Sequence, residues 1–497
     1  REDNECEVFS NVEVSRRGEA ITRLGSKRLN TTSLAAAQFV GLGRGINEDL
    51  GEVWVALKFG DGLYYRATDP EGAWSSKVTM SQSSGSNVIR MESVQDVSNA
   101  KKWMIFTGGG YSAGIIKWDG TAAPSTVASS PTGATLIRYV SGRVFLSGFA
   151  SDHFRVRYSD LGDPFTYPSA NKFYVQGGHG RISGLERQGE QLYIFCEYSI
   201  LALSGDPVGG FDLDVVLDNF GSWIEGSIST SGAATGFVGD NGFMIMSGGA
   251  VSSFSEKVRG IPSVAVASNS VVKSNAQFGL LSPFYWFYRP QLSIAADASA
   301  AATTGVDNFM YVFERERYQA WSLFVYPTTT DLGVSCPFFP LIEWEPKING
   351  VVMAGGDGNL YLQQMRRATS TEILGTSTDY TYTSDSDAGA QTVAVKSTVR
   401  LREQDMGTAY AQKIIRRGAV LGRGASGSLV YAYRNPEETR TTVTAKSATA
   451  LPFDTSTPGL ANTNRRRFAT VQPEITFQGG FLRGVSIEWK PVRFSSQ

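Results

Sequence analysis

The sequence predicts an all-β protein, with a β-propeller-like domain that carries inserted loops and a C-terminal β-sandwich-like domain. Three observations predict this fold class. Apolar, aromatic-rich runs come in pairs joined by glycine-containing turns, which is the pattern of β-hairpins. The pairs recur at intervals typical of four-stranded propeller blades. Helical periodicity is confined to two short segments, at 34–40 and 408–417.

The hairpins follow one another along most of the chain. Their starts lie at positions 52, 102, 143, 191, 242, 309 and 350, so successive starts are 50, 41, 48, 51, 67 and 41 residues apart. A propeller blade takes about 40 to 50 residues, so most of these intervals fit one blade each. The interval of 67 residues predicts an insertion, which we place near 260–290.

The composition changes after the last hairpin. We expect the propeller, with an N-terminal segment, to span 1–370, and a polar linker or loop to span 371–392, which is rich in Ser, Thr, Asp and Gly. Residues 393–497 carry further strand patterns and predict the second β domain, with packing of the N-terminal segment against it left open. Residues 376–497 hold 16 Lys or Arg and 10 Asp or Glu, which gives +6 and leaves −7 for 1–375.

Composition excludes several classes of protein. The net charge is −1, which argues against bulk coating of nucleic acid or binding to anionic membranes. Apolar runs stay short of the ~18 residues that a membrane-spanning helix needs, so we expect no membrane span. The three cysteines (Cys6, Cys196 and Cys336) lie far apart, so we expect free, mostly buried thiols rather than a disulfide framework.

Two glycine motifs match signatures of catalytic or nucleotide-binding loops. Gly422–Gly427 fits G-x-G-x-x-G, but a strand pattern follows it where the dinucleotide fingerprint needs a helix, so we interpret it as a turn. Gly110–Gly114 fits the G-x-S-x-G elbow around Ser112, yet it lies between two strand patterns instead of leading into a helix. A hairpin turn is the simpler interpretation of both.

Histidines and carboxylates offer little further chemistry. With only His153 and His179, the chain cannot build a histidine-based zinc cluster, and we expect His179 to have a packing or hydrogen-bonding role. Asp160 and Asp163 lie in a Ser/Asp/Gly/Pro cluster that favours a turn over catalysis or calcium binding. We therefore predict no catalytic, cofactor-binding or metal-binding residue.

Arginine clusters in the C-terminal part are the candidate interaction residues. Such clusters bind phosphates or form salt bridges across protein interfaces. The sequence is compatible with either partner, DNA or another subunit. The residues are Arg416, Arg417, Arg465, Arg466 and Arg467.

Several segments resemble the tail-nozzle proteins of short-tailed bacteriophages, also called tail tubular protein B. The most specific is a strand followed by Arg155–Tyr167. This second segment begins as a strand that ends in Ser-Asp and continues into an acidic, proline-containing turn that is followed by an aromatic residue. Further matching segments touch nearly the whole chain. They are Asn11–Glu19, Arg143–Gly148, Ile182–Arg187, Gln191–Phe195, Tyr198–Gly205, Gly221–Ile228, Arg465–Phe468 and Val485–Pro491.

The resemblance implies a structural, non-enzymatic virion protein of the short tail, assembled in the host cytoplasm. It implies a homo-hexameric ring below the portal and its adaptor ring, which acts as conduit and gate for DNA ejection and as attachment platform for tail fibres or spikes. No cofactor is expected. The alternative is a carbohydrate-binding or carbohydrate-cleaving propeller, which predicts a pocket with paired acids or aromatic platforms.

Overall fold

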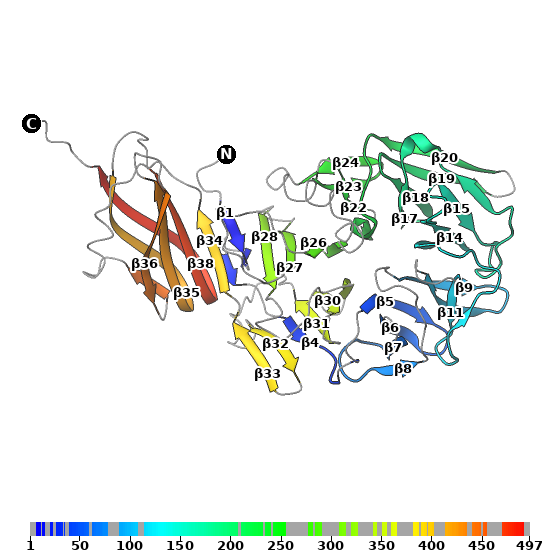
Figure 1. The fold of residues 1–497 in the computed structure, drawn as a ribbon, viewed down its shortest axis with the longest axis horizontal. Coiled ribbons are helices and arrows are strands. Elements are labelled where there is room, and N and C mark those ends of the chain that lie inside the picture. Colours follow the sequence, from blue (N-terminus) through cyan, green and yellow to red (C-terminus); the bar gives the residue numbers. More distant parts are fainter. Residues whose placement is uncertain are drawn as a thin grey trace, which may run out of the picture. The chain divides into compact units, whose positions relative to one another are not determined.

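A computed structural model shows that the protein is built almost entirely of β-strands (Figure 1). In the described residues, helix is limited to two short 3₁₀ turns, η1 (Gly177–His179) and η2 (Glu225–Ser227). The structure describes residues 6–10, 12–14, 20–22, 26–32, 34, 39–58, 62–77, 89–107, 114–206, 210–231, 234–239, 242–254, 277–281, 284–290, 308–314, 320–326, 341–344, 350–354, 359–364, 381–386, 389–394, 396–401, 413–434, 440–448, 451–454 and 470–491.

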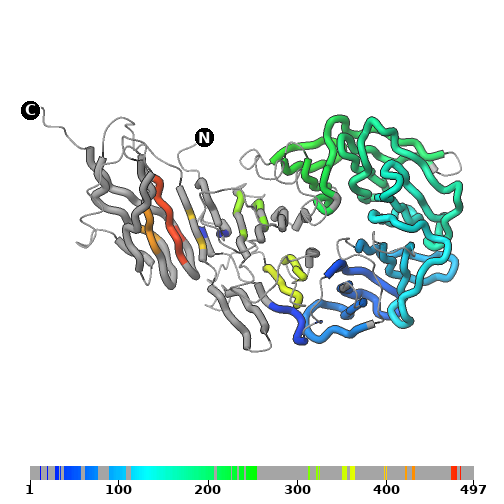
Figure 2. Tube along the Cα trace, viewed as in Figure 1, coloured from blue at the N-terminus to red at the C-terminus, as the bar shows by residue number. Residues whose placement is uncertain are grey.

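The chain divides into two compact units. One unit, 28–308 with 327–362, is the β-propeller, and the other comprises 1–27, 309–326 and 363–497. Figure 2 traces the described part of the propeller unit in blue to green along 39–254. The all-β prediction and the propeller prediction are both confirmed.

Six four-stranded antiparallel sheets form the blades within the described residues. Sheet 1 holds β5 (Phe39–Asn47), β6 (Gly51–Lys58), β7 (Gly62–Ala67) and β8 (Ser75–Lys77). Sheet 2 holds β9 (Arg90–Asp96), β10 (Lys101–Thr107), β11 (Ile116–Trp118) and β12 (Ser125–Thr126). Sheet 3 holds β13 (Leu136–Val140), β14 (Arg143–Ser147), β15 (Arg155–Tyr158) and β16 (Lys172–Tyr174).

The remaining sheets follow the same order, from the inner to the outer strand. Sheet 4 holds β17 (Ile182–Gln188), β18 (Gln191–Cys196), β19 (Ser199–Asp206) and β20 (Gly210–Asp218). Sheet 5 holds β21 (Ser229–Ser231), β22 (Ala234–Gly239), β23 (Gly242–Ser247) and β24 (Ala250–Ser253). Sheet 6 holds β29 (Leu341–Trp344), β30 (Gly350–Ala354), β31 (Leu360–Gln364) and, from the start of the chain, β4 (Ser26–Arg28).

The inner strands follow one another around the propeller axis. β29, β5, β9, β13, β17 and β21 are successive neighbours, and β25 (Gln277–Leu281) lies beside β21 and β29. β25 pairs antiparallel with β26 (Phe284–Pro290), so the insertion expected near 260–290 contains a hairpin. Residues 260–276 lie outside the described residues.

Apolar side chains fill the spaces between successive sheets, because the middle strands of a blade are buried on both faces. In β14, Val144 and Leu146 pack in the cluster between sheets 2 and 3, whereas Phe145 packs in the cluster between sheets 3 and 4. Further clusters join sheets 6 and 1, sheets 1 and 2, and sheets 4 and 5. The continuous apolar runs of the hairpins therefore follow from burial on two sides.

The segment after β4 joins sheet 6 to sheet 1. The Leu29 amide donates to the Leu360 carbonyl at 2.8 Å, and the Gly72 amide donates to the Leu29 carbonyl at 2.8 Å. Asn30, which is 2% exposed, accepts the Leu360 amide at 2.7 Å and donates to Asn359 Oδ1 at 3.1 Å. These bonds, which we call the seam, close the ring with uncharged groups.

The second unit is also all-β and sandwich-like. Its centre is a pair of 22-residue antiparallel strands, β35 (Lys413–Arg434) and β38 (Thr470–Pro491), with bulges in their pairing. Val420, Leu429, Ile475 and Phe477 are at most 1% exposed in it. Its other strands are β1 (Cys6–Ser10), β2 (Val12–Val14), β3 (Ala20–Thr22), β27 (Asn308–Glu314), β28 (Ala320–Tyr326), β32 (Thr381–Ser386), β33 (Gly389–Ala394), β34 (Lys396–Leu401), β36 (Arg440–Ala448) and β37 (Leu451–Asp454).

The structure divides the chain differently from the boundaries expected at 370 and 393. Residues 1–27 and 309–326 belong to the second unit, where β1 pairs with β34 and β3 pairs with β38. The range expected as a linker, 371–392, contains most of the β32–β33 hairpin. Hairpin patterns are local, so they do not reveal which distant strand completes a sheet.

Two expectations about burial and membranes can be compared with the described residues. Cys196 is a free, buried cysteine, and burial raises the pKa of its thiol to about 12. Cys6 lies in β1, and Cys336 lies outside the described residues. Where the structure describes the chain, it contains no helix of the length and apolar character needed to cross a membrane.

Candidate functional site

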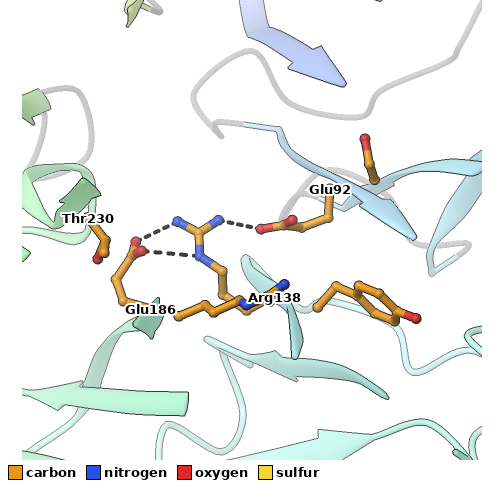
Figure 3. Close-up of a pocket in the computed structure, with 7 residues that line it drawn as sticks. Glu92, Arg138, Glu186 and Thr230 are labelled. Carbon is orange, nitrogen blue, oxygen red and sulfur yellow. Dashed lines mark hydrogen bonds and ion pairs between the residues drawn. The ribbon is translucent and has the colours of Figure 1, made fainter. Parts of the chain in front are cut away.

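The main cluster of ionisable side chains in the propeller lies on its inner strands. Glu92 is on β9, Arg138 is on β13 and Glu186 is on β17, so three successive sheets each contribute one residue. Figure 3 shows the Arg138 side chain between the two carboxylates. We call these three residues the axial clamp.

The guanidinium of Arg138 binds both carboxylates directly. Its Nη1 donates to Glu92 Oε1 at 2.5 Å, and its Nη2 donates to Glu186 Oε1 at 2.5 Å. A second bond, from Nε to Glu186 Oε2 at 3.3 Å, makes the contact with Glu186 bidentate. The planar guanidinium suits this geometry, which the point charge of a lysine could not reproduce.

Local strand geometry explains why these side chains meet. Side chains alternate across a strand, so Ile137 points into the core between sheets 2 and 3 while its neighbour Arg138 takes another direction. Leu185, beside Glu186, likewise packs in the core between sheets 3 and 4. The flanking apolar residues therefore fix the positions of the charged ones.

Burial and charge act in opposite directions on the clamp. The exposed fractions of the side chains are 26% for Arg138, 20% for Glu92 and 5% for Glu186. Burial by itself would lower the pKa of Arg138, but Glu186 and Glu92 raise it above its ordinary value. Burial raises the pKa of Glu92 above its usual 4.5, against the opposing effect of Arg138, and the charge of Glu186 adds to the rise.

A pocket of about 240 Å³ adjoins the clamp. Besides the clamp residues, it is lined by Ser93, Tyr139, Arg187 and Thr230. Arg187 also lowers the pKa of Glu92, although less than Arg138 does. Two glutamates and two arginines thus face this space, and their formal charges cancel.

The clamp is built to hold sheets together. Both carboxylates already bind a guanidinium that remains protonated, so neither is a free base beside an empty space. Among the described residues, no group of three His, Cys, Asp or Glu side chains could hold a metal ion. What this arrangement supplies is an ionic link across sheets 2, 3 and 4.

The arginines predicted from sequence lie elsewhere. Arg416 and Arg417 are in β35, where the backbone of Arg417 lies opposite that of Glu488 in β38 and the register shifts between Ile415 and Arg417. Residues 465–467 lie outside the described residues. Arg416 and Arg417 thus belong to the second unit, whereas the axial clamp belongs to the propeller.

The turn predicted around Asp160 and Asp163 and the hydrogen-bonding role predicted for His179 are both present in the structure. Asp163 Oδ1 accepts the Phe165 amide at 2.9 Å and Asp160 Oδ1 accepts from Asn171 Nδ2 at 2.8 Å, which confirms the turn. His179 Nδ1 lies 2.8 Å from Ser199 Oγ, which is the expected hydrogen-bonding role.

One of the glycine interpretations is corrected. Gly422–Gly427 is not a turn between strands, because β35 continues through it as a bulged strand. A bulge bends a strand without ending it, and its glycines resemble turn glycines in sequence. Ser112 lies outside the described residues.

Sequence reasoning missed the axial clamp entirely. Its members are about 46 to 48 residues apart in the chain, so no local motif joins them. The available signal was a charged residue directly after an apolar one in the first strand of three successive blades. These pairs are Met91-Glu92, Ile137-Arg138 and Leu185-Glu186. Only the propeller register places such residues side by side.

Comparisons with known proteins identify no family for this chain. No protein-family model and no curated protein matches the chain. Among solved structures, it is similar to BamB from Moraxella catarrhalis, with 13% identity, a TM-score of 0.41, and coverage of 71% of this chain and 99% of that one. It is similar to Saccharomyces cerevisiae Sqt1, with 10% identity, a TM-score of 0.39, and coverage of 69% and 100%. The β-propeller domain of the Trilobed protease from Pyrococcus furiosus matches with 9% identity, a TM-score of 0.33, and coverage of 68% and 98%.

Proposed function

We propose that this chain is a structural subunit of a short phage tail, a nozzle protein that assembles into a ring. In this role it is a conduit and gate for DNA and an attachment platform for fibres or spikes. The observation that carries the non-enzymatic part is the axial clamp, because the ionisable groups at the propeller axis bind one another across three sheets. The phage assignment rests on the sequence resemblance.

The segments that carry the resemblance have structural positions. Arg143–Ser147 forms β14, Arg155–Tyr158 forms β15, and Ser199–Asp206 forms β19. Val144, Val156 and Ile200 in these strands are fully buried. Buried apolar residues of this kind stabilise a propeller blade, so a sequence resemblance at these segments supports a shared blade fold.

The clamp also limits where DNA could pass. It crosses the axis side of sheets 2, 3 and 4, and the pocket beside it, at about 240 Å³, is smaller than most small-molecule cavities and far too small for DNA. In the proposed assembly, DNA therefore passes through a channel formed between several copies. The net charge of −1 suits a conduit, since a strongly basic channel would retain the DNA.

Cryo-electron microscopy of complexes purified with a tagged copy from producing cells or from particles tests the proposal. We expect a sixfold ring of propellers stacked on an adaptor ring, with a channel along the ring axis. Particles from which the chain is absent, or single propellers that never associate with tail proteins, would contradict it.

The alternative, a carbohydrate-active propeller, is favoured by one observation: the pocket contains two glutamates, Glu92 and Glu186. Glycoside hydrolysis uses two carboxyl groups, one of which has a raised pKa, as Glu92 has. The test is a glycan array and a cleavage assay on host polysaccharide with wild type and Glu92→Gln. Binding or cleavage that Glu92→Gln abolishes would favour this function, whereas silence of the wild type would exclude it.

A further inference from the structure

One strand edge of the propeller differs from all the others described. The outer strands of five sheets are short, with two to four residues in β8, β12, β16, β24 and β4. The outer strand of sheet 4, β20, has nine residues, and no described strand pairs with its outer edge. A long unpaired edge presents a row of free backbone groups, which proteins usually avoid by shortening the strand.

The side chains of this edge are acidic and apolar. Asp212, Asp214 and Asp218 are exposed, and Val215 is 50% exposed between them. Two aromatic residues near the C-terminal end of β20 are also exposed. Tyr198, just before β19, is 46% exposed, and Phe220, just after β20, is 36% exposed. We call these six residues the β20 edge.

The edge lies in a stretch with a consistent charge. Between positions 188 and 256, which include β18 to β24, the sequence has nine Asp or Glu and no Lys or Arg. Residues 376–497 have the opposite bias, with 16 Lys or Arg against 10 Asp or Glu. The chain thus carries two regions of complementary charge that together leave it almost neutral.

Charge also decides how two copies could meet. If the β20 edges of two copies paired with each other, aspartates would lie opposite aspartates, which is destabilising. An arginine-rich surface fits better, because guanidinium groups donate to carboxylates and backbone carbonyls and stack on aromatic rings. A contact between two different surfaces of the same chain is heterologous, and such contacts form a ring when the rotation between neighbouring copies closes.

We propose that the β20 edge binds the basic C-terminal part of a second copy of this chain, around Arg416 and Arg417. The inference deepens the proposed function, because it names the subunit contact of the ring, but its test does not depend on finding a phage. The partner is another copy because this chain itself supplies the complementary charge.

Full-length variants that remove the charge of the edge test the acidic side. In Asp212→Asn/Asp214→Asn/Asp218→Asn, the amide oxygens can still accept the bonds from Ser204 Oγ and the Asn219 amide, so the hairpin is preserved. The control, Glu48→Gln/Glu52→Gln/Glu71→Gln, makes the same change of net charge at sheet 1. Glu48 and Glu71 are exposed in its turns, and the side chain of Glu52 in β6 is 40% exposed. Association is measured by sedimentation velocity over a concentration series at about 0.05 M and about 0.5 M salt.

We expect the wild type and the control to associate, more strongly at low salt, and the edge variant to associate about tenfold more weakly or less still. A wild type that stays monomeric at low salt overturns the proposal. So does an edge variant that associates like the wild type. A difference that does not depend on protein concentration would show pairing within one chain, which overturns it as well.

A charge exchange tests the pairing of the two surfaces. Asp212→Lys/Asp214→Lys and Arg416→Glu/Arg417→Glu should each fail to associate alone, and an equimolar mixture should associate again, because each repulsive surface then meets an attractive one. Circular dichroism of each variant confirms folding. A mixture that does not recover, or an arginine variant that associates normally and instead loses DNA binding, overturns the proposal.

The outcomes for the contact and for the function are separable. A ring in tail particles whose neighbouring copies meet elsewhere would refute the β20 contact and leave the nozzle function standing. If the charge-exchanged copies associate only as a mixture and the protein is absent from tail particles, the β20 contact stands and the nozzle function is refuted.

Discussion

The seam and the axial clamp hold the same propeller together with different chemistry. The seam joins sheets 6 and 1 through Leu29 and Asn30, with backbone and amide groups that carry no charge. The clamp joins sheets 2, 3 and 4 through one guanidinium and two carboxylates. The comparison teaches that only the clamp can respond to pH, whereas the seam should be equally strong wherever the amide groups stay intact.

The largest effect is expected from removing the shared cation. Arg138→Met leaves Glu92 and Glu186 facing each other with neither bound to a guanidinium in the clamp, and with only the weaker influence of Arg187 to offset their charges. This should lower the free energy of unfolding of the propeller by about 3 to 5 kcal/mol at neutral pH. Chemical denaturation followed by circular dichroism measures this loss. Hydrogen exchange should show the greatest increase in β13 and β17.

A triple variant is the control for the origin of that loss. In Glu92→Gln/Arg138→Met/Glu186→Gln no unpaired charge is left, so most of the lost stability should return, since neutral replacements of buried ion pairs are often tolerated. If the triple variant were as unstable as Arg138→Met, packing of the arginine stem, and not charge, would be responsible.

The seam is expected to contribute less per residue. Asn30→Ala removes the buried acceptor of the Leu360 amide and the donor to Asn359 Oδ1, which should cost about 2 to 3 kcal/mol. The matched control is Thr32→Ala, because Asn30 Nδ2 donates to the Thr32 backbone carbonyl and not to its exposed side chain. If the loss of stability in Asn30→Ala varied strongly with pH, the contrast between an uncharged seam and a charged clamp would be wrong.

Much of the propeller could be predicted from the sequence because its hairpins are local. Apolar runs such as Val144-Phe145-Leu146 indicate a strand that is buried on two faces, and the intervals between glycine turns indicate the length of a blade. The clamp could not be predicted, because Glu92, Arg138 and Glu186 meet only through the register of three sheets. The place of 309–326 in the second unit could not be predicted for the same reason, since its hairpin pattern carries no information about distant partners.

Reactivity of Cys196 can distinguish opening at the clamp from opening at the seam. This thiol is buried in the core between sheets 3 and 4, and its pKa of about 12 makes it a poor nucleophile in the closed propeller. Arg138→Met should therefore speed its alkylation at pH 8, by about tenfold for each 1.4 kcal/mol of lost local stability. Peptide mass spectrometry reports this cysteine separately. Equal acceleration by Asn30→Ala would show that the two regions open together.

The smallest effect is the pH dependence contributed by Glu92. Because burial raises the pKa of Glu92 above its usual 4.5, the folded protein binds this proton more tightly than the unfolded chain does. The contribution of Glu92 to stability is therefore fully present below pH 4.5 and is lost as the pH rises through the raised value. Glu92→Gln, which stays neutral, should match the wild type at pH 4.5 and be slightly more stable at pH 7. Unfolding curves across this range measure the difference. An advantage of the wild type that grows with pH would mean that the attraction of Arg138 exceeds the cost of burial, and the clamp would then be strongest with Glu92 ionised.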